Sequence, residues 1–430
     1  MNTPPGHDMA CRQCLTPLNI LNGTYCHPSH LPDPGHQPQP TPVSAMEIVN
    51  RRCDFCGDPF PLWQLDTGDL TVIAGTADTQ LLQNLGSSWA ACHPCWTDID
   101  TTSPAQLTHK AIRGLGITAD PHTVAHLSAL HHTLIEHRRP GRTLITTTPW
   151  PPAAIGAADL PKIRTRLAAF LAGTDRLPAP MDAHRQQIQA SLARAHLYWI
   201  DPAFTELAQH AATSLPPDAI TAELAPCDDG LLAWPHPVTA RHITAISWTR
   251  QPSGHTVTVY RTIGNGLPDP HIQHLRQQIG WLAPAATHHL TQSSTAVHPA
   301  VAVAAATWLL ITQQAAETVE APPAKAARNT ARRTGKPAPP VRIVRIKPAT
   351  PAGTIHTGDA GKRLYRNRFW VTGHWRNQPY GPGRTQRRLV YISPFLRGPH
   401  DAPITATTTV RALTTRPPAA TANPGKDENP

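Results

Sequence analysis

Apolar positions recur at helical spacing through the segment 103–200 of this 430-residue chain. Ser103 and Asp120 each precede a proline, and both predict a helix start, because their side chains cap helices and proline suits the first turn. The leucines that follow Asp120 keep one face apolar. Two further helices are predicted at 160–172 and 182–200.

Alternating and β-branched residues replace this pattern further along the chain. The segments HITAISWT and HTVTVYRT flank RQPSG, a pattern typical of a β-hairpin, and the preceding GLLAWP predicts another strand. Helices are predicted again at about 268–280 and 300–320. From residue 341 the runs VRIVRI, RFWVTGHW and RRLVYISPF return to strand patterning.

These patterns predict an α+β multi-domain protein. It would have N-terminal zinc-ribbon or treble-clef-like modules, a helical middle and a small basic C-terminal β domain. The expected segments are a possible zinc module of three cysteines and one histidine with a proline-rich leader at 1–45, a four-cysteine zinc module at 46–102, a helical region at 103–220, an α+β domain with a hairpin at 221–320, a basic Pro/Ala-rich linker at 321–340, a basic β-rich domain at 341–404 and a disordered tail at 405–430.

The sequence also indicates where in the cell the protein is expected. The longest apolar run, 300–312, is shorter than the roughly 20 residues that span a bilayer, and the first residues lack a secretory signal. We therefore expect a cytoplasmic protein without a membrane partner. The 48 prolines indicate many loops, although a high-GC coding bias accounts for part of that number.

Charge is distributed unevenly along the chain. The net charge is +10, but residues 321–400 hold 17 Lys/Arg and the single acid Asp359, or +16, which leaves −6 for the remainder. A basic end on a mildly acidic body points to a polyanionic partner or to a solvated tail.

Six of the eight cysteines lie in C-x-x-C pairs, which in a reducing compartment are more often metal ligands than disulfides. Cys53 and Cys56 are followed after 35 residues by Cys92 and Cys95. The intervening residues suffice for a hairpin, and a helix follows the second pair. Four thiolates suit tetrahedral Zn²⁺ and leave no open position, so we predict one structural zinc ion.

A second zinc ion is possible nearer the start of the chain. Cys11, Cys14, Cys26 and His30 have reasonable ligand spacing, and His27 or His36 could replace His30. The alternative is a proline-rich leader with incidental cysteines, because Met46 would also be a plausible start of translation.

No motif names a reaction. Cys227 stands alone, and a solitary cysteine is usually a buried apolar residue rather than a nucleophile. Phosphate-binding loops and hydrolase or kinase signatures are absent from the sequence. We therefore predict no catalytic residues, and keep an enzyme with an unidentified site in 221–320 as an alternative.

The basic C-terminal segment interleaves arginines with aromatic residues. Arginines neutralise phosphates, and aromatic rings stack on unpaired bases, so this pattern favours nucleic-acid binding. Alternatively, the aromatic residues form a small core and the arginines pack on the acidic body, or the protein is a zinc-stabilised interaction scaffold with protein partners. The predicted nucleic-acid contacts are Trp375, Arg376, Arg384, Arg387 and Arg388.

The segment HWRNQPYGPGR, continuing through RRLVYISPFLRGP, resembles the C-terminal signature of a family of uncharacterised proteins from high-GC actinobacteria. GLLAWP…ITAISWT and CDFCG…WAACHPC are also similar to segments of such proteins. The resemblance covers 46–102, 230–262 and 368–404, and it implies a lineage but no activity or catalytic residue. Regulation or mobile-element biology would fit a non-enzymatic, nucleic-acid-binding protein of this kind.

Overall fold

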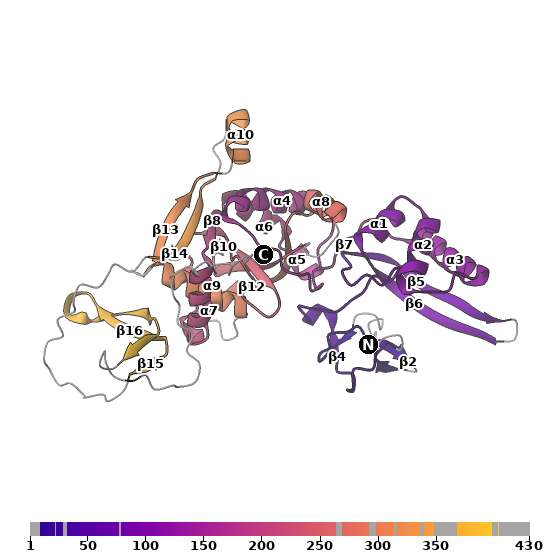
Figure 1. The fold of residues 1–430 in the computed structure, drawn as a ribbon, viewed down its shortest axis with the longest axis horizontal. Helices are drawn as coiled ribbons and strands as arrows, with labels where there is room; N and C mark the ends of the chain where they lie inside the picture. Colours follow the sequence, from indigo (N-terminus) through magenta and orange to yellow (C-terminus); the bar gives the residue numbers. More distant parts are fainter. Residues whose placement is uncertain are drawn as a thin grey trace, which may run out of the picture.

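A computed structural model (Figure 1) describes residues 9–21, 23–28, 32–76, 79–263, 269–291, 298–313, 316–323, 325–335, 339–347, 368–397 and 403. The expected tail at 405–430 lies outside these residues. The described chain is a mixed α/β structure with one large sheet and several small ones, in agreement with the predicted mixture of helices and strands.

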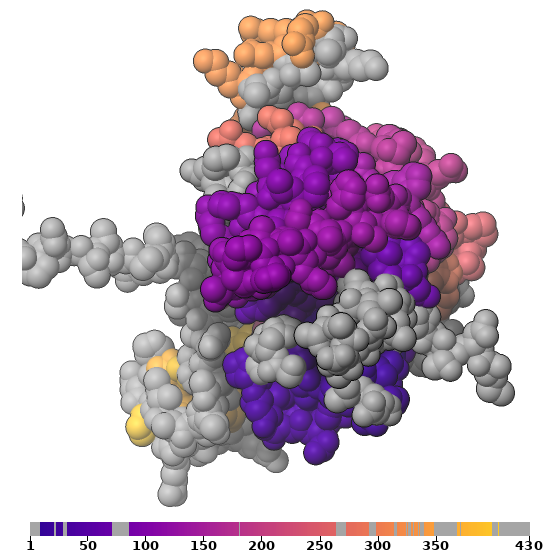
Figure 2. Space-filling view, turned by 90° about the vertical axis from the view of Figure 1, so that its right-hand side faces the viewer, coloured from indigo at the N-terminus to yellow at the C-terminus, as the bar shows by residue number. Residues whose placement is uncertain are grey.

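A small module begins the described chain. Strand β1 (Met9–Cys11) pairs with β4 (Pro40–Pro42), β2 (Asn19–Leu21) pairs with β3 (Thr24–Cys26), and the 3-10 turn η1 (Val43–Ala45) comes next. The module forms the indigo lobe in Figure 2. A backbone hydrogen bond connects it to the chain that follows, since the Asn50 N–H donates to the Leu15 carbonyl at 2.7 Å. The neighbouring Val49 N–H donates to the Thr147 carbonyl at 3.0 Å.

The four-cysteine module is a long hairpin followed by three helices. Strands β5 (Trp63–Thr76) and β6 (Thr79–Ala91) are antiparallel, and β7 (Thr143–Leu144) pairs with the base of β5. Helices α1 (His93–Asp100), α2 (Pro104–Leu115) and α3 (Pro121–His137) follow. Both predicted helix starts are confirmed: Ser103 and Asp120 are the N-caps of α2 and α3, and the Asp120 carboxylate accepts from the Thr123 N–H at 3.0 Å.

A seven-stranded sheet organises the rest of the molecule, in the order β12-β11-β10-β9-β8-β14-β13. Strand β8 is parallel to both of its neighbours, and the other pairs are antiparallel. The strands are β8 (His196–Ile200), β9 (Asp229–Ala233), β10 (Ile243–Gln251), β11 (Gly254–Thr262), β12 (Leu282–Leu290), β13 (Ala316–Ala321) and β14 (Val341–Ile346). The predicted hairpin is confirmed as β10 and β11.

Helices cover both faces of this sheet. One face packs with α4 (Leu160–Ala172) and α6 (Arg185–Arg194), and the other with α7 (Pro202–Ala212) and α9 (Pro299–Ile311). Consecutive residues Leu197 and Tyr198 of β8 therefore enter different cores, as strand alternation requires. Further helical segments in this part of the chain are η2 (Ala157–Asp159), α5 (Ala179–Asp182), η3 (Pro217–Ala219), η4 (Ala222–Leu224) and α8 (Asp269–Gln278).

Two predicted helices are shorter than expected. The helix predicted at 182–200 ends at Arg194, and LYWI belongs to β8 because its aromatic and branched residues fill a strand buried on both faces. The helix predicted at 300–320 ends at Ile311. The alternating AETVEA that follows forms β13 at the edge of the sheet.

The structure also differs from the expected division at residue 341. Strand β14 lies inside the large sheet, between β8 and β13, and does not open a separate C-terminal domain. The segment 321–340, expected as a linker, connects two adjacent strands and contains helix α10 (Lys325–Thr334). An isolated strand sequence such as VRIVRI cannot show which sheet it joins, because its partners are distant in sequence.

Two small hairpin-like pairs complete the described chain. Strand β15 (Phe369–Val371) pairs with β18 (Phe395–Arg397), and β16 (His374–Tyr380) pairs with β17 (Gln386–Ile392) around the turn η5 (Pro382–Arg384). Among the described residues, no helix combines the length and the apolar character needed to cross a bilayer.

Candidate metal centres and nucleic-acid surface

The four-cysteine site is built from two tight turns. Cys53 and Cys56 lie on a knuckle in which the Cys53 N–H donates to the Asp58 carbonyl and the Gly57 N–H to the Cys53 carbonyl, both at 2.8 Å. Gly57 has φ +72°, a conformation that favours glycine. Cys92 is the N-cap of α1, and Cys95 lies in the first turn of that helix.

These turns bring all four sulfurs together. The Sγ atoms of Cys53, Cys56, Cys92 and Cys95 lie within 4.8 Å of one another, and Cys56 and Cys92 are 3.6 Å apart. A zinc tetrahedron with Zn–S bonds of about 2.3 Å separates its sulfurs by roughly 3.8 Å. The predicted convergence of the two pairs is therefore confirmed, and knuckle, hairpin and helix follow in the expected order.

The electrostatics of this cluster fit a cation. Hydrogen bonds from Cys53, Cys92 and Cys95 lower the pKa of Cys56, whereas close cysteine neighbours raise the pKa of the Cys92 and Cys95 thiols. Four thiolates this close repel one another, so they coexist only around a positive ion. The donor set fits Zn²⁺ with every tetrahedral position taken by sulfur.

Helix α2 packs directly on the knuckle. A Cβ added at Gly114 would lie 2.2 Å from the Cys56 carbonyl oxygen, so only glycine allows this approach. Beside the cluster, Lys110 donates to the Pro94 carbonyl at 2.9 Å and pairs with Asp98 at 2.6 Å. These contacts hold α1 and α2 in fixed positions around the sulfurs.

The N-terminal cluster differs from the primary prediction. Its ligand atoms within 4.8 Å of one another belong to Cys11, Cys14, His27 and His36. The Cys11 Sγ is 3.4 Å from the His36 Nε2, and the Cys14 Sγ is 3.4 Å from the His27 Nε2.

The other two predicted ligands are elsewhere. Cys26 is not a member of the group, and its thiol donates to the Asn19 carbonyl at 3.7 Å. His30 lies outside the described residues. The structure thus provides a set of two cysteines and two histidines, which uses both of the alternative histidines and also fits tetrahedral Zn²⁺.

Local backbone chemistry places His36. The Asp33 carboxylate accepts from the Gly35 N–H at 2.9 Å, Gly35 has φ +70°, and the His36 Nδ1 lies 3.1 Å from the Pro34 carbonyl. The sequence Asp-Pro-Gly-His is a turn signal that could have selected this histidine. The pKa of the ligand Cys11 is also shifted. Burial raises this pKa, but hydrogen bonds from the N–H groups of Cys14 and Gln39 and from the His36 ring outweigh burial and lower the pKa to about 5.

The C-terminal hairpin has two different faces. Trp375 pairs across the strands with Tyr391, with ring centroids 5.1 Å apart, and the Trp375 Nε1 donates to the Ala211 carbonyl of α7 at 2.8 Å. Trp375 therefore packs the hairpin onto the body. The structure does not group it with the predicted arginine contacts, because strand alternation sends Trp375 and Arg376 to opposite faces.

We call the opposite side the outer face, formed by His374, Arg376, Gln378, Tyr380, Gln386, Arg388, Val390 and Ile392. Arg376 and Arg388 are exposed; Arg376 donates to Gln378, and the Arg388 guanidinium lies 5.6 Å from the Tyr380 ring centroid. Arg384 is exposed in the turn η5. Arg387 is exposed at the start of β17, on the same face as Trp375, and donates to the Arg384 carbonyl at 3.1 Å. The four predicted arginines are thus exposed on one hairpin, and two of them, Arg376 and Arg388, lie on its outer face.

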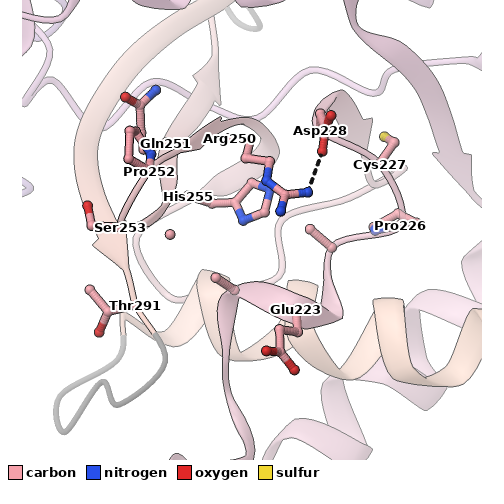
Figure 3. A pocket seen from close by; sticks show the side chains of 13 residues that line it. Glu223, Pro226, Cys227, Asp228, Arg250, Gln251, Pro252, Ser253, His255 and Thr291 are labelled. Atoms are coloured by element: carbon pink, nitrogen blue, oxygen red, sulfur yellow. Dashed lines mark hydrogen bonds and ion pairs between the residues drawn. The ribbon is translucent and has the colours of Figure 1, made fainter.

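A cavity of about 790 Å³ lies at the end of the β10–β11 hairpin, in the region where an enzyme site remained an alternative. Figure 3 shows its lining, in which Arg250 is paired with Asp228 at 3.1 Å. The buried His255 is the cross-strand neighbour of Arg250. Burial lowers the pKa of His255, and neither ring nitrogen has a hydrogen-bond partner among the described residues.

Cys227 lines the same cavity. Burial raises its pKa, its thiol donates to the Asp229 carbonyl at 3.2 Å, and Tyr198 donates to its sulfur at 3.7 Å. Within the described lining, no base forms a hydrogen bond with this thiol. The described geometry therefore does not assemble a cysteine nucleophile with its base.

Comparison with known proteins finds a similarity to a described family. Residues 198–398 match a protein family described as AcrVA2-like, the anti-CRISPR type V subtype A2 family. Neither the comparison with curated proteins nor that with solved structures yields a match. The matched segment is similar to that family from β8 through β18, and it leaves both cysteine clusters outside.

Proposed function

We propose that this chain is a non-enzymatic nucleic-acid-binding protein associated with mobile elements, whose N-terminal modules are folded around structural zinc. The mobile-element association is supported by the similarity of 198–398 to a family whose name describes action against type V CRISPR systems. CRISPR effectors act on guide RNA and target DNA, so a polyanion-binding surface suits this setting.

The observation that carries the proposal is the exposed outer face of the β16–β17 hairpin. Arginine guanidinium groups bind phosphate oxygens in a bidentate manner, and the Tyr380 ring offers a stacking surface. Among the described residues, no acidic side chain forms an ion pair with Arg376, Arg384, Arg387 or Arg388. Their charge is therefore available to a partner and is not used against the acidic body.

The test is binding of the full chain to a fluorescent single-stranded oligonucleotide, measured by anisotropy across a salt series. We expect R376Q/R388Q to bind more weakly and to lower the log–log salt slope by about 1.4, since each phosphate contact on a single strand contributes about 0.7. The matched control is R113Q/R139Q, which removes two exposed arginines of the four-cysteine module. No binding by the wild-type protein at low salt, or equal slopes for the two variants, would refute the proposal.

A second candidate function is binding to a protein component of a type V CRISPR system, favoured by the family similarity itself. Zinc modules often serve to fold a recognition surface, and they would do so here without contacting nucleic acid. Capture of a purified type V effector that persists after nuclease treatment and is unchanged in R376Q/R388Q would favour this function. Capture that is lost with nuclease would favour the first.

A further inference from the structure

Helix α10 occupies an unusual place in the fold. It is inserted between β13 and β14, which are adjacent antiparallel strands and could have been joined by a short turn. Figure 1 shows α10 beyond the ends of these strands, with no other labelled element beside it. The diprolines Pro322-Pro323 and Pro339-Pro340 flank the insertion and stiffen both of its connections.

The helix has a defined end. Gly335 follows the last helical residue with φ +67°, the left-handed conformation typical of a helix C-terminal stop. Arg332 and Arg333 lie in the last turn, where positive charge is favourable. Its sequence thus specifies a short helix of its own rather than an extended linker.

The helix is strongly and uniformly basic. Lys325, Arg328, Arg332 and Arg333 are all exposed, and no acidic residue occurs between Glu320 and Asp359. At 3.6 residues per turn, these four positions share one side of the helix. None of the four has an acidic partner among the described residues.

No contact in the described part of the chain explains how α10 is stabilised. A ten-residue helix is marginal in water by itself, and four like charges on one side make it less stable. Most helices gain stability from a packed apolar face, whereas Figure 1 shows no element packed on this one. A polyanionic partner would remove the repulsion and hold the helix.

The composition of α10 selects the class of partner. Its sequence KAARNTARRT contains no aromatic residue, leucine or methionine. Membrane-surface helices need such apolar residues for insertion. Hot spots of protein interfaces are enriched in Trp and Tyr as well as Arg, and α10 offers only the arginines. A helix about 10–12 Å wide does fit the major groove of B-DNA, which is about 12 Å wide, and places its arginines near the phosphates.

We propose that α10 is a second nucleic-acid-binding surface, which engages the phosphates bordering the major groove of duplex DNA. The inference rests on the proposed nucleic-acid-binding function and extends it. The outer face of the hairpin binds unpaired bases and their phosphates, and α10 binds a neighbouring double-stranded portion. A substrate with a junction between single and double strands would occupy both.

The experiment compares three full-chain variants on two fluorescent probes, a duplex of about 20 base pairs and a single strand, each across a salt series. R328Q/R332Q/R333Q removes three charges from α10 while glutamine preserves helix propensity. R376Q/R388Q tests the hairpin, and R113Q/R139Q is the charge control. Since every substituted arginine is exposed, all three variants should melt at the wild-type temperature.

We expect the α10 variant to lower the salt slope for the duplex by up to about 2.7, because each phosphate contact on B-DNA contributes about 0.9. Its single-strand slope should stay at the wild-type value. An unchanged duplex slope, an equal loss on both probes, or displacement of the duplex by polyglutamate as readily as by unlabelled DNA would overturn the inference. A hairpin variant that binds single strands normally, beside an α10 variant that fails on the duplex, would refute the proposed role of the hairpin and leave α10 supported.

Discussion

The approach of Gly114 to the zinc knuckle gives the sharpest test of the four-cysteine centre. In Gly114→Ala the added Cβ would lie 2.2 Å from the Cys56 carbonyl oxygen and 3.0 Å from the Cys56 Cβ, where ordinary contact begins at 3.4 Å. Both atoms sit on constrained elements, so α2 or the knuckle must retreat by roughly 1 Å or more. Zinc sites tolerate changes of only about 0.2 Å in their ligand distances.

The magnitude follows from two opposing effects. Overpacking of this kind costs about 1–3 kcal/mol, and the better helix propensity of alanine returns about 1 kcal/mol. Since the 2.2 Å clash is with a backbone oxygen, the cost lies at the upper end of that range, and the net loss is about 2 kcal/mol. This loss corresponds to zinc binding that is roughly 30-fold weaker, because the knuckle relaxes most easily by leaving the metal.

Zinc affinity is measured by competition with a chromophoric chelator, together with melting in excess zinc. Gly68→Ala is the matched control, because Gly68 is exposed and its added Cβ would have no atom within 4 Å. If Gly114→Ala binds zinc and melts as the wild-type protein does, the packing of α2 on the knuckle is not as the structure has it. A control that weakens binding equally would also contradict the argument.

Three further predictions concern other parts of the chain. Elemental analysis should find two zinc ions per chain and one in either Cys92→Ser or Cys11→Ser; two ions retained by Cys11→Ser would contradict the N-terminal centre. Trp375→Phe loses the hydrogen bond to Ala211, worth about 1 kcal/mol, and should speed proteolysis at the η5 turn, whereas Tyr380→Phe should not. Burial raises the pKa of Glu47, but the His298 hydrogen bond and charge and the charge of Arg241 outweigh it and lower that pKa to about 2 from 4.5. Its contribution to stability is therefore present above about pH 4.5 and lost as the pH falls toward 2, and urea midpoints of Glu47→Gln and the wild-type protein should converge over that range.

Metal ligands and helix starts can be predicted from the sequence where the residues that form them are close along the chain. Two C-x-x-C pairs each fit a single turn, and the starts of α2 and α3 follow from capping residues beside proline. The ligands of the N-terminal centre are harder to predict, because its histidines lie on turns and several histidines fit the spacing expected of zinc ligands. Only the fold shows that His27 and His36 meet Cys11 and Cys14.

Other features depended on contacts between distant segments. Val341–Ile346 has a pattern that would suit a strand in any sheet, and its position beside β8 depends on residues more than a hundred positions away. Trp375 lies within a run of exposed arginines, yet alternation and the Ala211 carbonyl direct it inward. A single sequence records the strand but not the surface against which that strand packs.

The position of β14 in the large sheet affects how the protein folds during synthesis and where it can be truncated. Strand β8 leaves the ribosome more than a hundred residues before its neighbour β14, and during that interval one side of β8 has no backbone partner. Nascent chains that stall in this interval should depend on chaperones, and any expression fragment cut between 321 and 340 would keep that open edge permanently. Fragments intended to report on the C-terminal hairpin should therefore begin upstream of residue 196.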